Sequence, residues 1–124
     1  MTTRRSHPPD EPPAGALSPA AFHVLVALAG GDLHGYAILK EVDERTAGAV
    51  RLSTGTLYGL VRRFLEDGWI VESPRRPGSD EDSRRRTYRL TALGRSIAQA
   101  EARRLESMVA AARARRLLGT GGKA

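Results

Sequence analysis

The sequence predicts a mainly α-helical domain with a small antiparallel β wing, followed by one long C-terminal helix. Three observations lead to this prediction. Residues 52–70 have the apolar spacing of an amphipathic helix, residues 74–86 form a charged segment between two strand signals, and residues 91–118 continue a helical pattern almost without a break. The chain has 124 residues, which suits one domain with a modest core.

Two further helices are expected before residue 52. Residues 18–19 place a serine N-cap before a proline at the first helical position, and Gly30-Gly31 ends that helix. The second helix should run from about Gly35 to Thr46. The buried faces are expected to carry Phe22, Leu25, Val26 and Ala29 in the first helix and Ile38, Leu39 and Val42 in the second.

The third helix carries the most informative pattern. Ser53 is a good N-cap because its hydroxyl can accept from the free amides of the first turn, and Gly68 suits the position after the helix. The inward face is expected to carry Leu57, Leu60, Val61, Phe64 and Leu65, and the outward face Gly55, Tyr58, Gly59, Arg62 and Arg63. Two glycines four residues apart expose the backbone beside hydroxyls and arginines, which suits close approach to a polyanion. The alternative is an ordinary solvated helix face.

A wing is expected around this helix. Residues 50–52 could form a short strand before it, and Trp69–Ser73 and Thr87–Leu90 have strand propensity. The segment between the last two contains Pro, Gly and Ser and no apolar residue, as in a hairpin with a long charged tip. The order of elements predicts a winged helix-turn-helix, whose third helix would enter the major groove with its N-terminal part leading. The wing would reach the phosphate backbone or the adjacent minor groove.

The net charge of +6 is unevenly distributed. Residues 51–63 carry three arginines and no acidic residue, and residues 91–118 carry six arginines and two glutamates. Six further arginines lie in residues 74–90. Clustered basic charge on a small domain is typical of nucleic-acid binding.

Other classes of function find no support in the sequence. There is no cysteine, and His7, His23 and His34 lack the spacing of metal ligands, so no metal site and no cofactor are expected. No nucleophile and base form a recognisable pair, so the chain is not expected to be an enzyme. No apolar run reaches the length of a membrane span and no signal peptide is apparent, so a cytoplasmic protein without membrane contact is expected.

Several motifs in order resemble the PadR family of bacterial transcriptional regulators. They are His34-Gly35-Tyr36, Gly55-Thr56-Leu57-Tyr58 and the return from the wing, Tyr88-Arg89-Leu90-Thr91. The resemblance covers residues 17–118 and implies a winged helix-turn-helix that binds DNA. It also implies the short type, in which one C-terminal helix per subunit builds a dimer. Some short-type members bind flat aromatic drugs between C-terminal helices that carry an aromatic residue. Residues 91–118 contain no aromatic residue, which argues against that mode here.

The last helix is longer than a small winged domain needs. A helix of about 26 residues spans roughly 40 Å, so that its apolar face would overhang the domain and remain exposed in a monomer. A second copy of the chain is the expected partner, and the alternative is packing back on its own domain. Glu101 and Arg104 interrupt the apolar face, either pairing across the dimer or lining a cavity.

These observations divide the chain into four parts. Residues 1–16, which contain four prolines, and residues 119–124 are expected to be disordered tails, residues 17–90 the DNA-binding domain, and residues 91–118 the dimerisation helix. The expected DNA-binding residues are Ser53, Thr54, Gly55, Thr56, Tyr58, Arg62 and Arg63 of the third helix, Lys40 of the second, and Arg75, Arg76, Arg84, Arg85 and Arg86 of the wing. The expected dimer interface consists of Leu93, Ile97, Leu105, Met108, Val109 and Ala112.

The function expected from the sequence is that of a homodimeric, sequence-specific repressor, bound to an inverted-repeat operator in double-stranded DNA. The sequence leaves open whether a small-molecule or stress signal relieves repression, and it identifies no effector. Two alternatives remain at this stage. The winged domain could bind another protein, and its basic surface would then be incidental. It could instead bind RNA.

Overall fold

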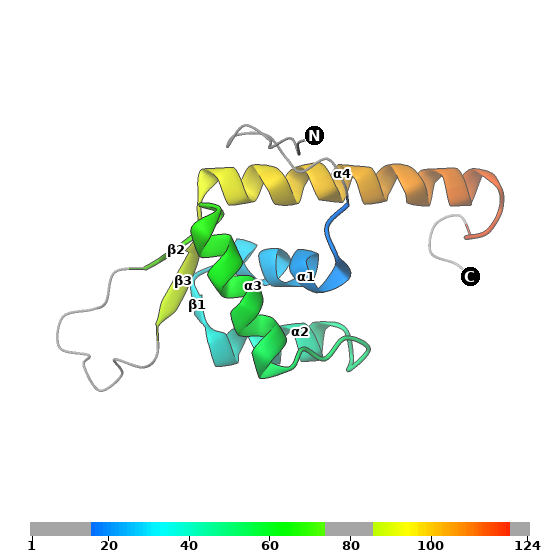
Figure 1. The fold of residues 1–124 in the computed structure, drawn as a ribbon. Coiled ribbons are helices and arrows are strands. Elements are labelled where there is room, and N and C mark those ends of the chain that lie inside the picture. The colour runs from blue at the N-terminus through cyan, green and yellow to red at the C-terminus, as the bar shows by residue number, and fades with distance from the viewer. Residues whose placement is uncertain (1–15, 74–85, 120–124) are drawn as a thin grey trace, which may run out of the picture.

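The computed structural model describes residues 16–73 and 86–119, which form four helices and one three-stranded sheet (Figure 1). The elements in chain order are α1 (Pro19–Ala29), β1 (Leu33–His34), α2 (Gly35–Arg45), α3 (Thr54–Glu66), β2 (Ile70–Glu72), β3 (Thr87–Leu90) and α4 (Ala92–Ala114). This architecture confirms the predicted fold class. Except for Ala16 and Gly119, the two predicted tails lie outside the described residues.

The helices begin at the capping residues that the sequence indicates. Ser18, Ser53 and Thr91 each accept a hydrogen bond from the amide three residues later, at 3.1, 3.0 and 2.9 Å. His34 caps α2 in the same way through Nδ1, which accepts from the amide of Ala37 at 3.2 Å. The imidazole therefore acts as the N-cap of α2.

The sheet has the order β1-β3-β2, and both pairs are antiparallel. Leu33 of β1 faces Tyr88 of β3, and Ile70 of β2 faces Leu90 of β3. The wing predicted from two strands therefore has a third strand on the other side of β3. A strand of two residues is too short to show an alternating pattern, which is why the sequence did not indicate it.

The short strand expected at residues 50–52 is wrong, because these residues form no strand in the structure. Thr46 instead organises the stretch after α2. Its hydroxyl accepts from the amide of Val50 at 3.1 Å and donates to the carbonyl of Val42 at 2.9 Å. The side chain of Val50 packs against the core from this loop, so the apolar character of the stretch reflects burial rather than strand pairing.

The core lies among α1, α2, α3 and the first half of α4. Its buried apolar residues are Ala21, Val24, Leu25, Ala27, Leu28, Ile38, Val42, Leu57, Val61, Phe64, Ile70, Tyr88 and Ile97. Phe64 stacks on Trp69 with ring centroids 5.1 Å apart, which fixes the end of α3 against the start of the wing. Two residues expected to be buried are exposed: Ala29 at the end of α1, and Leu65, which is 36% exposed because it lies about 100° around the helix from Phe64.

A tight corner joins the wing to α4. The hydroxyl of Thr91 donates to the carbonyl of Gly68 at 2.7 Å, and Gly94 lies so close to the carbonyl of Trp69 that a Cβ at this position would overlap it. After this corner, α4 packs against α1. The C-terminal half of α4 extends beyond the rest of the domain (Figure 1).

Candidate nucleic-acid interface

The N-terminal half of α3 presents a polar surface to solvent. Leu57, Val61 and Phe64 anchor the helix in the core, and this leaves the opposite side free. The exposed residues on that side include Ser53, Thr54, Gly55, Thr56, Tyr58, Gly59, Arg62 and Arg63. A Cβ built at Gly55 or Gly59 would meet no atom within 4 Å, so the backbone of α3 is open to a close partner at both positions.

Tyr58 is only partly available to a partner. Its phenol leans over the start of α2, where Gly35 is buried beneath it. The ring also lies near Tyr88 of the wing. Burial chiefly raises the pKa of the Tyr88 hydroxyl, and the neighbouring Tyr58 contributes to that rise. Tyr58 therefore stands where α2, α3 and β3 meet.

The predicted cations of α2 and α3 are exposed, and some have acidic neighbours on their own helix. Lys40 lies 3.6 Å from Glu44, and Arg63 lies 4.0 Å from Asp67. Exposed pairs of this kind contribute little and separate readily, so both cations can turn to a phosphate group. Arg62 of α3 is also exposed.

The wing arginines are described only in part. Arg75, Arg76, Arg84 and Arg85 lie outside the described residues. Arg86, just before β3, is exposed and pairs with Glu72 of β2 at 3.1 Å. The structure therefore places one predicted wing cation at the base of the wing.

A carboxylate at the base of the wing was not indicated by the sequence. Asp32 accepts hydrogen bonds from Arg89 at 3.0 Å and from the hydroxyl of Ser73 at 2.9 Å. These bonds lower the pKa of Asp32, with Arg89 as the main cause, and raise the pKa of Arg89. The three residues are 41 and 57 positions apart in the chain, so no local pattern could reveal the contact.

Tyr36 is a second residue that the sequence reasoning omitted from the interface. It is the second residue of α2 and is 67% exposed, next to the glycine that Tyr58 covers. Its sequence signal is the His34-Gly35-Tyr36 motif, which places an aromatic residue with a hydroxyl group at the start of α2. An exposed aromatic residue with a hydroxyl at this place can contact a nucleic-acid backbone.

The expected dimer interface on α4 needs a correction. Ile97 is 2% exposed and belongs to the chain's own core, and Leu93 is partly buried against the same core. The first half of α4 therefore packs on its own domain. This is the alternative that the sequence left open for the whole helix, and it holds for the first half. The residues left for a partner are Leu105, Met108, Val109 and Ala112, of which Met108 is 55% exposed.

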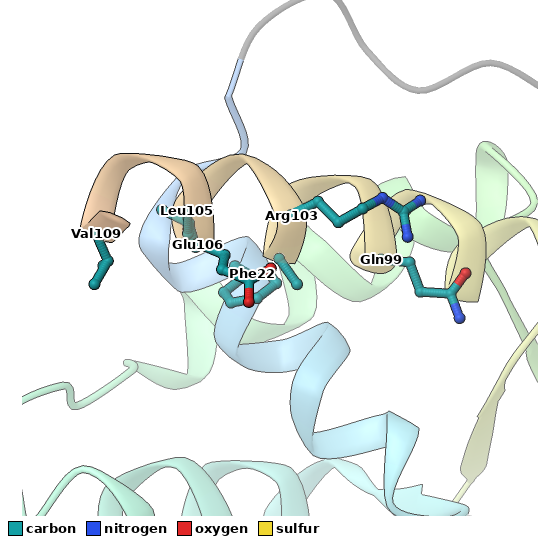
Figure 2. Close-up of a pocket in the computed structure, with 7 residues that line it drawn as sticks. Phe22, Gln99, Arg103, Leu105, Glu106 and Val109 are labelled. Atoms are coloured by element: carbon teal, nitrogen blue, oxygen red, sulfur yellow. The ribbon is translucent and has the colours of Figure 1, made fainter. Parts of the chain in front are cut away.

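A shallow groove lies beside this remaining apolar surface. Its volume is about 510 Å³, and Figure 2 shows Phe22 of α1 reaching up to the underside of α4 within it. The groove is lined by Phe22, Gln99, Ala102, Arg103, Leu105, Glu106 and Val109. The apolar strip on the second half of α4 thus continues onto the side of α1.

Glu101 and Arg104 pair with each other within one chain. Glu101 is 6% exposed and accepts from Arg104 at 2.6 and 3.0 Å, while the amide of Leu17 lies 3.5 Å from its Oε1. Arg104 is the main cause that lowers the pKa of Glu101. The pair therefore joins the segment before α1 to the middle of α4.

The end of α4 turns sharply. The amide of Leu117 donates to the carbonyl of Ala112 at 2.9 Å, and that of Arg116 donates to Arg113 at 2.9 Å. This is a Schellman motif, with Arg116 at φ 66° where glycine is usual. The turn leaves Leu117 and Leu118 exposed beyond the helix.

The described residues offer no other kind of site. Within 16–73 and 86–119, no three His, Asp or Glu side chains gather in a way that could hold a metal ion. In the same part of the chain, every helix is too short or too polar to cross a membrane.

Comparisons with known proteins agree with this arrangement. Residues 24–100 match the family model of the PadR-like transcriptional regulators. The chain is 32% identical over 98 residues to the transcriptional regulator Rv3488 of Mycobacterium tuberculosis, covering 79% of this chain and 81% of that protein. It is also 41% identical over 83 residues to an uncharacterised 37.1 kDa protein in transposon TN4556 of Streptomyces fradiae, of which it spans only 22%.

Solved structures share the fold. A PadR family transcription regulator from Clostridium difficile has a TM-score of 0.65 and 24% identity, covering 80% of this chain and 97% of that one. Bacillus subtilis PadR, solved in complex with operator DNA, has a TM-score of 0.57 and 19% identity, covering 67% of this chain and 46% of that one. The family match over most of the ordered domain, the relative from M. tuberculosis and the shared fold lead to one conclusion: the chain belongs to the PadR-like family of transcriptional regulators, which are not enzymes.

Proposed function

We propose that the chain represses transcription by binding an operator in double-stranded DNA as a homodimer. The observation that carries this proposal is the exposed N-terminal half of α3, where two open glycines lie among hydroxyls and arginines. A helix with an unobstructed backbone and cationic flanks suits the major groove, where its leading residues meet base edges. The site residues predicted from α2 and α3 are all exposed, as this mode requires.

The structural relatives support DNA as the partner. Bacillus subtilis PadR, which shares this fold, was solved in complex with operator DNA. In the present chain, Arg62 and Thr56 would contact base edges, and Lys40, Arg63 and Arg86 would contact phosphates. Tyr36 adds a candidate backbone contact at the first turn of α2.

The second half of α4 supports a homodimer. Met108 and Val109 are exposed on a helix that extends beyond its own domain, and the groove beside Phe22 continues this apolar surface. A second copy related by a two-fold axis would cover both. Two recognition helices would then face successive major grooves about 34–36 Å apart, so the operator would be an inverted repeat. A signal that tilts the α4 helices would change this spacing.

Operator binding is tested by selecting duplexes from a random-sequence pool with the purified chain and measuring affinity at several salt concentrations. We expect an inverted repeat and an affinity that falls steeply with salt, because phosphate contacts release counterions. Selection of an unstructured single-stranded RNA in a parallel pool, with no enrichment of duplex DNA, would overturn the proposal in favour of RNA binding. Enrichment of neither would favour a protein-interaction module.

Repression itself needs a reporter. A promoter that contains the selected operator should be silenced by the chain in a heterologous bacterial host and should recover when the operator half-sites are scrambled. Activation of that promoter would instead identify the chain as an activator.

A further inference from the structure

The carboxylate of Asp32 connects all three strands of the wing through side-chain hydrogen bonds. Asp32 lies immediately before β1, Arg89 is in β3, and Ser73 directly follows β2. The guanidinium of Arg89 donates to Asp32 through Nε at 3.2 Å and through its terminal nitrogen at 3.0 Å. The Ser73 hydroxyl donates to the same carboxylate at 2.9 Å, so both outer strands are linked across the central one.

The strand register explains how one side chain reaches so far. Leu33 faces Tyr88, and extending this antiparallel register by one residue places Asp32 opposite Arg89. On the other side of β3, the amide of Ser73 donates to the carbonyl of Thr87 at 2.7 Å. The Asp32 carboxylate thus binds the chain at Ser73, the residue at which it leaves the sheet after β2.

This contact differs from the ion pair of Arg86 and Glu72, which also lies in the described part of the wing. Arg86 and Glu72 connect only β2 and β3, which already share a ladder of backbone hydrogen bonds. The Asp32 contact instead spans all three strands, and Asp32 lies in the segment between α1 and α2, next to β1. The strands have only two, three and four residues, and a sheet this small has little stability from its backbone ladder alone.

We propose that Asp32 is a positioning residue for DNA binding, which holds the wing at a fixed angle to α3 so that Arg86 meets the phosphate backbone while α3 lies in the groove. This inference rests on the proposed function. Arg89 serves as the cation of this contact and is not itself offered to DNA. Asp32 and Arg89 are partly exposed, but the carboxylate accepts from two nitrogens of Arg89 and from the Ser73 hydroxyl, so the contact does not depend on a single hydrogen bond.

Electrostatics alone predicts the opposite result from positioning, which makes the inference testable. An acidic side chain near a polyanion repels it, so removing Asp32 would strengthen DNA binding if charge were its only effect. If Asp32 positions the wing, its removal weakens binding although the protein becomes more positive. The sign of the change therefore separates the two explanations.

The experiment measures binding to a duplex selected by the wild-type chain from a random-sequence pool. We expect Asp32→Ala to weaken binding by roughly fivefold and to flatten the salt dependence by about one unit of slope, the loss of about one phosphate contact. Ser73→Ala removes the hydrogen bond from the hydroxyl to Asp32 without changing the net charge, and it should also weaken DNA binding, by a smaller factor. Glu66→Ala is the matched control, because it removes an exposed acid from the end of α3 without affecting the wing, and it should bind as well as wild type or better.

A purely structural role would produce a different pattern. A variant that only lowered the folded fraction would lose affinity without any change in salt slope, and its melting temperature would fall in parallel. Asp32→Ala that binds as tightly as wild type, or more tightly, would overturn the inference while leaving the proposed function in place. Wild-type protein that selects no duplex would overturn the proposed function, and this inference with it.

Discussion

The phenol of Tyr58 occupies the space that a side chain at Gly35 would need, so α3 rests directly on the first turn of α2. A Cβ at Gly35 would overlap both the hydroxyl and the ring carbon that bears it. The backbone at Gly35 is an ordinary helix start, so the need for glycine comes from this close approach and not from its dihedral angles. Gly35 and Tyr58, which belong to two separate sequence motifs 23 positions apart, thus form one contact.

Gly35→Ala should therefore push the phenol of Tyr58 aside. Overpacking typically costs about 1–3 kcal/mol of unfolding free energy, and the cost here should lie at the lower end because the atoms that must move are the far end of a side chain that is 43% exposed. Chemical denaturation measures the loss, and DNA titration should show weaker binding. In a Tyr58→Ala background the added methyl has room, so the same substitution should cost little. An equal cost in both backgrounds would show that Tyr58 is not the residue that excludes a side chain there.

Arg62→Ala should weaken operator binding by roughly 1–3 kcal/mol if its guanidinium meets a guanine edge. The side chain is exposed, so the unfolding free energy should hardly change. Footprinting with base-substituted operators distinguishes the two kinds of contact. A loss confined to one base position indicates base recognition, whereas an equal loss on all sequences indicates a phosphate contact. Unchanged affinity in Arg62→Ala and in Tyr58→Ala would place the DNA surface elsewhere.

Met108→Glu should convert the proposed dimer to monomers and abolish operator binding, because it places a charge on the exposed apolar strip of α4. Sedimentation should show the change in mass, and circular dichroism should show an intact winged domain. Ser96→Glu is the matched control, because it adds the same charge at an exposed position of the first half of α4 outside the groove, and it should leave the protein dimeric. Wild-type protein that sediments as a monomer at tens of micromolar would refute the dimer and the inverted repeat together.

Glu101→Gln should destabilise the chain at neutral pH and make its stability less dependent on acid. The carboxylate is buried and its pKa is lowered by Arg104, so its contribution is present above the unfolded pKa and is lost as pH falls through the folded pKa. We expect a cost of about 1–2 kcal/mol at pH 7, at the lower end for a hydrogen-bonded charge because Arg104 is half-exposed. Denaturation at pH 7 and in the acid range below pH 4.5, the usual value for this side chain, tests it. Glu106→Gln, exposed on the same helix, should leave both unchanged.

Most of the fold could be predicted because its elements carry local signals. Ser53 and the apolar spacing after it define α3, and the run from 87 to 90 defines β3 at its observed bounds. The sequence does not indicate β1 because a strand of two residues cannot show an alternating apolar pattern, and its partner strand lies more than 50 residues later in the chain. The sequence shows which residues share a face but not what covers that face, which is why Ile97 was assigned to a partner when it belongs to the chain's own core.

The candidate site was predictable to the extent that it depends on helix phase. The polar face of α3 follows from the positions of Leu57 and Phe64, and its exposure agrees with that inference. The hydrogen bonds of Asp32 and the position of the Tyr58 ring over Gly35 depend on tertiary packing between distant segments. Neither composition nor spacing could reveal them.

The overhang of α4 divides a single helix between two cooperative units. Its first half is buried with the domain through Ile97, while its second half packs on little of its own chain. A helical segment of about a dozen residues is marginal in water without packing, so the last turns depend on contact with another surface for their order. Amide hydrogen exchange in that half should slow as protein concentration rises, while exchange in the first half should not. The winged domain would then fold first, and the end of α4 would become fully ordered only as two subunits meet.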